Sequence, residues 1–122
     1  MYGIQVNECD VEWAPLEMPG VMMKILHRDE ATGAMAVLTR MEPGARIPAH
    51  FHTLADETVY VLAGDFVEDG ERHGPGAYFA GKAGVPHGPH ETVGGCTVLT
   101  HFSDELDFQL LASPPASPAG ND

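Results

Sequence analysis

The chain has 122 residues, enough for one domain with a single core. Its 18 acidic side chains outnumber the 6 lysines and arginines and give a formal net charge of −12. Such a surface repels phosphate backbones and anionic lipid, so we expect it to bind neither nucleic acid nor membrane.

The start of the chain carries no recognisable targeting signal. No apolar run approaches the roughly 20 residues of a membrane-spanning helix, and residues 1–8 lack the basic start and apolar core of a signal peptide. Cys9 and Cys96 lie far apart in the sequence and are expected to stay reduced. We therefore predict a cytoplasmic protein. Trp13 is expected in an N-terminal strand that packs on a neighbouring subunit.

From residue 20 onward, short apolar runs alternate with turn residues. The expected strands cover residues 21–28, 34–41, 57–62, 65–68 and 96–102. Asp69-Gly70 predicts a sharp turn. The 14 glycines and 10 prolines suit many short strands, and no helical period is convincing in the middle of the chain. We predict an all-β fold, a barrel or a double-sheet jelly roll, over residues 1–112, followed by a disordered tail at 113–122.

Residues 44–64 contain the side chains expected of a metal site. His50 and His52 are one residue apart in a strand-like segment, so their side chains point to the same face. Glu57 opens a β-branched and aromatic run after a break that can turn the chain back. A carboxylate on the inner face of a strand needs a partner, because burying an unpaired charge is costly. Asp56 is the rival carboxylate, and it faces away if the strand begins at Glu57.

A second stretch, residues 76–87, carries spaced glycines and ends on His87 after an apolar pair. Neutral imidazoles and a carboxylate suit Fe, Mn, Ni, Cu or Zn. Four protein ligands in an octahedral shell leave two neighbouring positions open. A closed structural zinc site would instead recruit cysteine, and neither cysteine lies at ligand spacing from a histidine.

The other histidines are assigned lesser roles. His101 lies on the opposite face of its strand from residues 96, 98, 100 and 102, and it either supports the site or is a structural histidine. His90, in a proline-bounded loop, is expected to be solvated at the mouth of the site. His73 and His27 are expected on the surface.

Four further residues have alternative interpretations. Tyr60 and Phe66 either line a cavity or pack on the outer sheet. Arg46 and Lys82 either lie near the site, where they would help to hold an anionic or enolate oxygen, or are solvated turn residues.

The two stretches together resemble the motifs of the cupin superfamily. The first follows the pattern G-x5-H-x-H-x4-E-x6-G at Gly44, His50, His52, Glu57 and Gly64. The second follows G-x5-P-x-G-x2-H at Gly76, Gly84 and His87. It departs from the family at Lys82, where the pattern has proline, and at Glu91, where it often has asparagine. The run from residue 81 to residue 90, followed by Gly95-Cys96, is most similar to the ChrR-type cupins.

The resemblance, over roughly residues 11–102, implies a double-stranded β-helix (a jelly-roll barrel) and usually a homodimer. It also implies one divalent metal per chain, iron(II) by preference and otherwise zinc, manganese or nickel. The ligands it implies are His50, His52, Glu57 and His87.

Two functions follow from the resemblance. One is an iron(II)-dependent dioxygenase acting on a small enolisable carbonyl compound, such as a β-diketone or a hydroxyketone. The other is a non-catalytic zinc cupin that senses a small ligand or contacts a partner protein, as in an anti-sigma factor. The helical domain with which an anti-sigma factor grips its target has no counterpart in this sequence, so we expect the enzyme.

Overall fold

The computed structural model describes residues 1–111 as an all-β jelly-roll sandwich, with a single 3-10 turn, η1 (Glu8–Asp10), before the strands. The predicted fold class is therefore confirmed. The predicted disordered tail, residues 113–122, lies outside the described residues. None of the helical segments within residues 1–111 is long and apolar enough to span a membrane.

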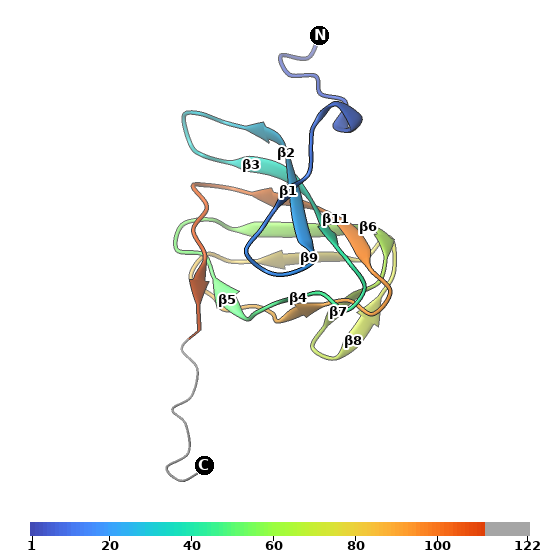
Figure 1. The fold of residues 1–122 in the computed structure, drawn as a ribbon. Helices are drawn as coiled ribbons and strands as arrows, with labels where there is room; N and C mark the ends of the chain where they lie inside the picture. The colour runs from blue at the N-terminus through green and yellow to red at the C-terminus, as the bar shows by residue number, and fades with distance from the viewer. Residues whose placement is uncertain (112–122) are drawn as a thin grey trace.

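One layer is a six-stranded antiparallel sheet in the order β1-β2-β3-β11-β6-β9 (Figure 1). Its strands are β1 (Ala14–Pro15), β2 (Val21–Arg28), β3 (Met35–Met41), β6 (Glu57–Gly64), β9 (Tyr78–Gly81) and β11 (Cys96–Phe102). The predicted strands at residues 21–28, 34–41, 57–62 and 96–102 are thus present.

The opposing layer consists of shorter strands in two sheets. One has the order β4-β10-β7-β8, and the other pairs β12 with β5. These strands are β4 (Arg46–Ile47), β5 (His50–Phe51), β7 (Phe66–Glu68), β8 (Glu71–His73), β10 (His90–Glu91) and β12 (Gln109–Leu110). The predicted turn at Asp69-Gly70 joins β7 to β8, and both of its residues have positive φ.

Alternation along the strands places the core between the layers. In β6, Val59 and Val61 are buried whereas Tyr60 and Leu62 are exposed. In β11, the buried residues are Cys96, Val98, Thr100 and Phe102. Each strand therefore turns one face to the interior, and the inner face of β6 begins with Glu57.

The segment of the first motif is not one continuous strand. Pro48 separates β4 from β5, and the two short strands belong to different sheets, β4 pairing with β10 and β5 with β12. Proline lacks the N–H that a continuous ladder would need, which explains the break. The C-terminal strand β12 consequently lies beside the histidine strand (Figure 1).

Alanine at Gly64 is expected to destabilise the fold by roughly 3 kcal/mol or more, which is a large effect for one methyl group. Gly64 has φ +79°, and a Cβ there would lie 2.0 Å from the carbonyl oxygen of Gly95. Gly44 is the matched control, because it has φ +81° but no atom within 4 Å of the added Cβ. Gly44→Ala should therefore cost only the left-handed strain, about 1 kcal/mol. Urea unfolding measures the free energy of unfolding of both variants, and equal losses of stability would contradict the steric argument.

Candidate metal centre

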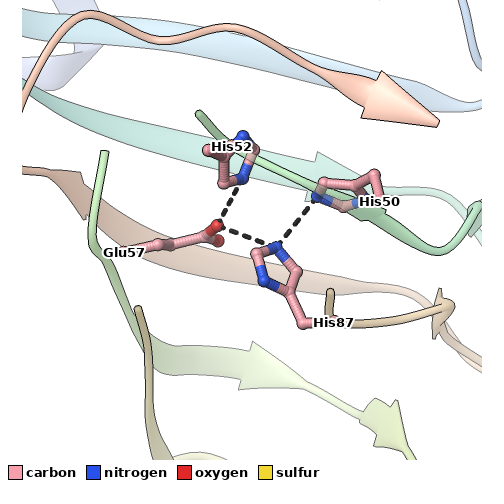
Figure 2. A group of neighbouring side chains, drawn as sticks. All are labelled: His50, His52, Glu57 and His87. Carbon is pink, nitrogen blue, oxygen red and sulfur yellow. Dashed lines mark hydrogen bonds and ion pairs between the residues drawn. The ribbon is translucent and has the colours of Figure 1, made fainter. Parts of the chain in front are cut away.

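Three parts of the chain bring four polar side chains to one point (Figure 2). His50 lies in β5, His52 directly follows that strand, and Glu57 is the first residue of β6. His87 comes from the loop between β9 and β10. This loop is held against β5 by two backbone hydrogen bonds, from His50 N to His87 O and from His87 N to His50 O. Backbone pairing thus positions residues from both motifs.

The four donor atoms converge. Nε2 of His52 lies 2.8 Å from Oε1 of Glu57, and Nε2 of His87 lies 3.2 Å from the same oxygen. Nε2 of His87 is 3.0 Å from Nε2 of His50. One ligand atom from each residue lies within 4.8 Å of all the others. Figure 2 shows the three contacts as a chain that runs from His52 through Glu57 and His87 to His50.

These separations fit a bound cation. Two neighbouring ligands of an octahedral ion, each at about 2.1 Å, lie about 3.0 Å apart. The donor atoms of His50 and His87 face each other at that distance. Two neutral imidazole nitrogens in this arrangement share at most one proton, so a cation between them relieves the repulsion of their lone pairs. The group is therefore one that can hold a metal.

Backbone carbonyls orient two of the rings. Nδ1 of His50 donates to the carbonyl oxygen of Pro48 at 2.7 Å, and Nδ1 of His52 donates to that of Asp107 at 2.6 Å. With the proton on Nδ1, each neutral ring presents the lone pair of Nε2 to the centre. Asp107 is itself anchored, because its carboxylate accepts hydrogen bonds from the backbone N–H and the hydroxyl of Thr53.

The electrostatics of the metal-free group are uneven. Burial lowers the pKa of His50 to about 4, so this ring is neutral at neutral pH. Burial also opposes a charge on His52, but the hydrogen bonds with Glu57 and with the Asp107 carbonyl, together with the charges of these two carboxylates, outweigh it and raise the pKa of His52. Burial likewise opposes ionisation of Glu57, yet hydrogen bonds from His52 and His87 lower its pKa to about 2. Glu57 is therefore ionised at neutral pH, and its charge favours a cation at this centre, either a proton on His52 or a metal ion.

Asp56, the rival carboxylate, lies outside this group. Its Oδ1 accepts a hydrogen bond from the backbone N–H of Ala83 at 2.8 Å. Its own backbone N–H is bound by Ser103 Oγ at 2.8 Å. Asp56 thus ties the loop before His87 to β6, which is a structural role.

A cavity of about 480 Å³ opens beside the group. His50, His52 and Glu57 form part of its wall. The remaining wall is mostly apolar and is lined by Leu16, Met18, Met23, Met41, Ile47, Val59, Phe66, Val98, Phe102, Leu106, Phe108 and Leu110, with polar atoms from Glu17, Thr39, Thr100 and His90. A smaller cavity of about 140 Å³ lies on the side of His87.

Of the four residues with alternative interpretations, only Phe66 lines the cavity beside the metal group. Phe66 lines both cavities and is 3% exposed, whereas Tyr60 is exposed on the outer face of β6. Neither Arg46 nor Lys82 lines a cavity, and Arg46 pairs with Glu91 at 3.4 Å on the surface. Within residues 1–111 the larger cavity is lined by no lysine or arginine.

The prediction for His90 is wrong. The ring is 7% exposed in β10, and its Nδ1 is bound to Oε2 of Glu68 in β7. The proline-bounded loop suggested a solvated position, but the pairing of β10 with both β4 and β7 draws His90 into the interior. His101 is exposed on the outer face of β11 and lines neither cavity, so it does not support the site. His27 is exposed and His73 is partly buried against Phe79.

Sequence reasoning also missed the C-terminal contribution. Phe108 stacks on His50 with ring centroids 4.0 Å apart, and Asp107 supplies the carbonyl that orients His52. The only available signal was the alternation of Phe108 and Leu110 with polar residues, which is too short to identify a strand.

A jelly-roll sandwich with three histidines and a glutamate converging beside its interior cavity defines a cupin. The chain belongs to the cupin family described as the ChrR Cupin-like domain, whose profile it matches over residues 2–104. No curated protein matches it in sequence.

Solved structures share the fold. KdgF from a Halomonas species is 27% identical, with a TM-score of 0.73 over 87% of this chain and 97% of that chain. A chain in the complex of Rhodobacter sphaeroides SigE with the anti-sigma ChrR is 28% identical, with a TM-score of 0.63 over 78% of this chain and 50% of that one. A putative acetylacetone dioxygenase from Methylibium petroleiphilum is 17% identical, with a TM-score of 0.71 over 84% of this chain and 77% of that chain.

Proposed function

We propose that this cupin is an iron(II)-dependent dioxygenase that acts on a small, neutral, enolisable carbonyl compound. His50, His52, Glu57 and His87 would hold one metal ion. The observation that carries the proposal is the position of this donor group in the wall of a largely apolar cavity of about 480 Å³.

The donor set supports a catalytic metal. Three neutral imidazoles and one carboxylate suit a divalent first-row metal, and four protein ligands leave two positions for reactants. When bound, iron(II) supplies the Lewis acidity and the one-electron chemistry that dioxygen requires. The chain itself contributes the rest: backbone carbonyls of Pro48 and Asp107 fix two ligand rings, and the remaining wall of the cavity is mostly apolar.

The charge of the cavity supports a neutral substrate. No lysine or arginine lines it within the described residues, and Glu17 and Glu57 are carboxylates. A carboxylate substrate would find no counter-ion there other than the metal, and the net charge of −12 would repel it on approach. A small ketone or diketone is uncharged, so it needs no counter-ion and is not repelled by the net charge. The likeness to a putative acetylacetone dioxygenase agrees with this choice, although at 17% identity it is a likeness of fold.

Oxygen uptake by the reconstituted protein tests the proposal. Metal-free protein would be loaded separately with iron(II), manganese(II), nickel(II) and zinc and offered acetylacetone and hydroxyacetone in an oxygen electrode. We expect uptake with iron(II) above a protein-free iron control and none with zinc, which has no accessible redox change. His87→Ala should abolish the uptake, and the exposed His101→Ala should leave it unchanged. Absence of uptake with every redox metal would refute the dioxygenase.

A second candidate is a zinc-filled binding module, which the family match and the 28% identity to a chain of the SigE–ChrR complex favour. Zinc in protein purified without added metal, combined with ligand binding and no oxygen uptake, would establish this alternative. We also propose a homodimer in the cytoplasm. Exposed Leu99, Tyr60 and Tyr78 are cross-strand neighbours on the outer face of the large sheet and offer an apolar surface for a second copy.

A further inference from the structure

We propose that His90, held by Glu68, contacts the substrate through Nε2 and accepts a hydrogen bond from a substrate hydroxyl. This inference rests on the proposed function and narrows it: the preferred compounds carry a hydroxyl beside the carbonyl, as in an α-hydroxyketone, rather than two carbonyls. His90 lies outside the group of four metal-binding candidates.

His90 is deeply buried, and only one of its two ring nitrogens has a hydrogen-bond partner among the described residues. Its Nδ1 is bound to Glu68, whereas Nε2 has no hydrogen-bond partner among residues 1–111 and almost no contact with solvent. Leaving a buried polar atom unpaired costs about 1–3 kcal/mol, so most such atoms have a partner. The protein supplies none for Nε2, which indicates that a bound molecule does.

The ring is located where a substrate can supply that partner. His90 lines both the larger cavity and the smaller one, as do Glu57 and Phe66. Its centroid is 5.3 Å from that of His50 and 5.2 Å from that of His87. A compound held at the metal group and filling the larger cavity would therefore lie against His90.

Neighbouring groups fix the orientation of the ring. It is stacked on Phe66 on β7 and on His87, with interplanar angles of 25° and 28°. Glu68 lies two residues after Phe66 on the same strand, which places the carboxylate beside Nδ1. The ring therefore cannot exchange its two nitrogens without losing the contact with Glu68.

Glu68 also decides what Nε2 can recognise. An ionised carboxylate only accepts hydrogen bonds, so the proton of the neutral imidazole must be on Nδ1. Nε2 then carries a lone pair and accepts. A hydroxyl can donate to it, whereas a ketone oxygen or an ether oxygen cannot. This difference is the basis for selecting hydroxyl-bearing compounds.

The tautomer can be measured without any substrate. Long-range proton–nitrogen NMR spectra of nitrogen-labelled, zinc-loaded protein would be recorded at about pH 8, above the ordinary histidine pKa of about 6.5. His90→Gln identifies the His90 signals. We expect Nδ1 to be protonated and Nε2 to have the shift of an unprotonated acceptor. A His90 ring protonated on Nε2 would overturn the proposal. Glu68→Leu should remove the preference of the proton for Nδ1 of His90, because it removes the carboxylate that accepts the hydrogen bond from Nδ1.

A matched pair of ligands tests recognition. Hydroxyacetone and methoxyacetone differ by a methyl group that removes the donor, and their affinities for the zinc-loaded protein can be compared by calorimetry. We expect wild-type protein to bind hydroxyacetone roughly five- to tenfold more tightly, as one hydrogen bond allows. His90→Phe, which keeps a planar ring for stacking, should reduce this ratio to about one. Glu68→Leu should also reduce it, and His101→Phe should not.

The outcomes separate the two proposals. Metal content is measured for every variant, so that a lost metal is not mistaken for a lost contact. Equal affinities in wild-type protein, or a preference that survives His90→Phe, overturns the role of His90 even if the oxygen electrode supports the dioxygenase. A preference that depends on His90 without oxygen uptake supports the contact and refutes the dioxygenase. If the wild-type protein binds neither compound, the His90 proposal is overturned, and the oxygen electrode then decides the dioxygenase independently.

Discussion

Replacing His52 by alanine is expected to lower the affinity for a divalent metal by roughly 100-fold or more. Losing only the hydrogen-bond partner of a ligand typically costs about 10–100-fold, and here the donor itself is removed. Nε2 of His52 lies 2.8 Å from Oε1 of Glu57, so the change also leaves that buried carboxylate with one partner fewer. Metal analysis of the purified protein should give clearly less than one ion per chain. Added metal should no longer raise the thermal unfolding midpoint, since that rise reflects binding to the folded state.

Similar losses are expected for His50→Ala and His87→Ala, because each ring points Nε2 to the same centre. His101→Ala is the control, since His101 is exposed on the outer face of β11. Wild-type metal content in all three ligand variants would remove the metal site from this protein. A loss confined to one variant would instead identify a different ligand set.

Metal affinity is expected to fall with decreasing pH, and His52 is expected to start the fall. The pKa of His52 is raised, so protons begin to compete with the metal above pH 6.5. Each ligand that must release a proton contributes about tenfold per pH unit below its pKa. The pKa of His50 is about 4 and that of Glu57 about 2, so these two groups bind protons only in more acidic solution. Competition titrations with a fluorescent chelator between about pH 8 and 5 measure the dependence. An affinity that stays constant over this range would contradict ligation by His52.

Variants of the neighbouring carboxylates identify the cause. Glu57→Gln removes the negative charge that raises the pKa of His52, so the onset of the fall should move to lower pH while the overall affinity decreases. Asp56→Asn should leave both the affinity and the onset unchanged, because Asp56 contacts the backbone N–H of Ala83 instead. An effect of Asp56→Asn larger than that of Glu57→Gln would exchange the roles of the two carboxylates.

Much of the sheet could be predicted from local pattern. The burial alternation in β6 and β11 follows the period of two that their sequences contain, because successive side chains of a strand point to opposite faces. The same rule placed Glu57 and not Asp56 on the inner face. The strand-like segment expected around His50 and His52 is only the two-residue strand β5, which lies in a different sheet from β4 on the other side of Pro48. Pro48 is a local sign of the break, but the partners that β4 and β5 pair with, β10 and β12, are not encoded locally.

His90 illustrates the limit for single residues. In sequence it is a histidine between prolines and an acidic residue, which is typical of a solvated loop. In the fold its partner is Glu68, 22 positions earlier, and its neighbours in the stack are Phe66 and His87. Burial is a property of the assembled layers, so a two-residue strand inserted between β4 and β7 carries no local sign of it.

The sequence by itself determined the all-β class, the main strands, and the four residues that meet at the centre, because strand periodicity and motif spacing are local properties. Only the tertiary structure decided what surrounds those four residues. The carbonyl that orients His52 comes from Asp107, 55 positions away, and the ring that stacks on His50 comes from Phe108. The cavity, its lack of basic residues within 1–111 and the half-satisfied His90 likewise arise where both layers meet. Contacts between segments distant in sequence depend on how the sheets pair, and no short stretch of the chain contains that information.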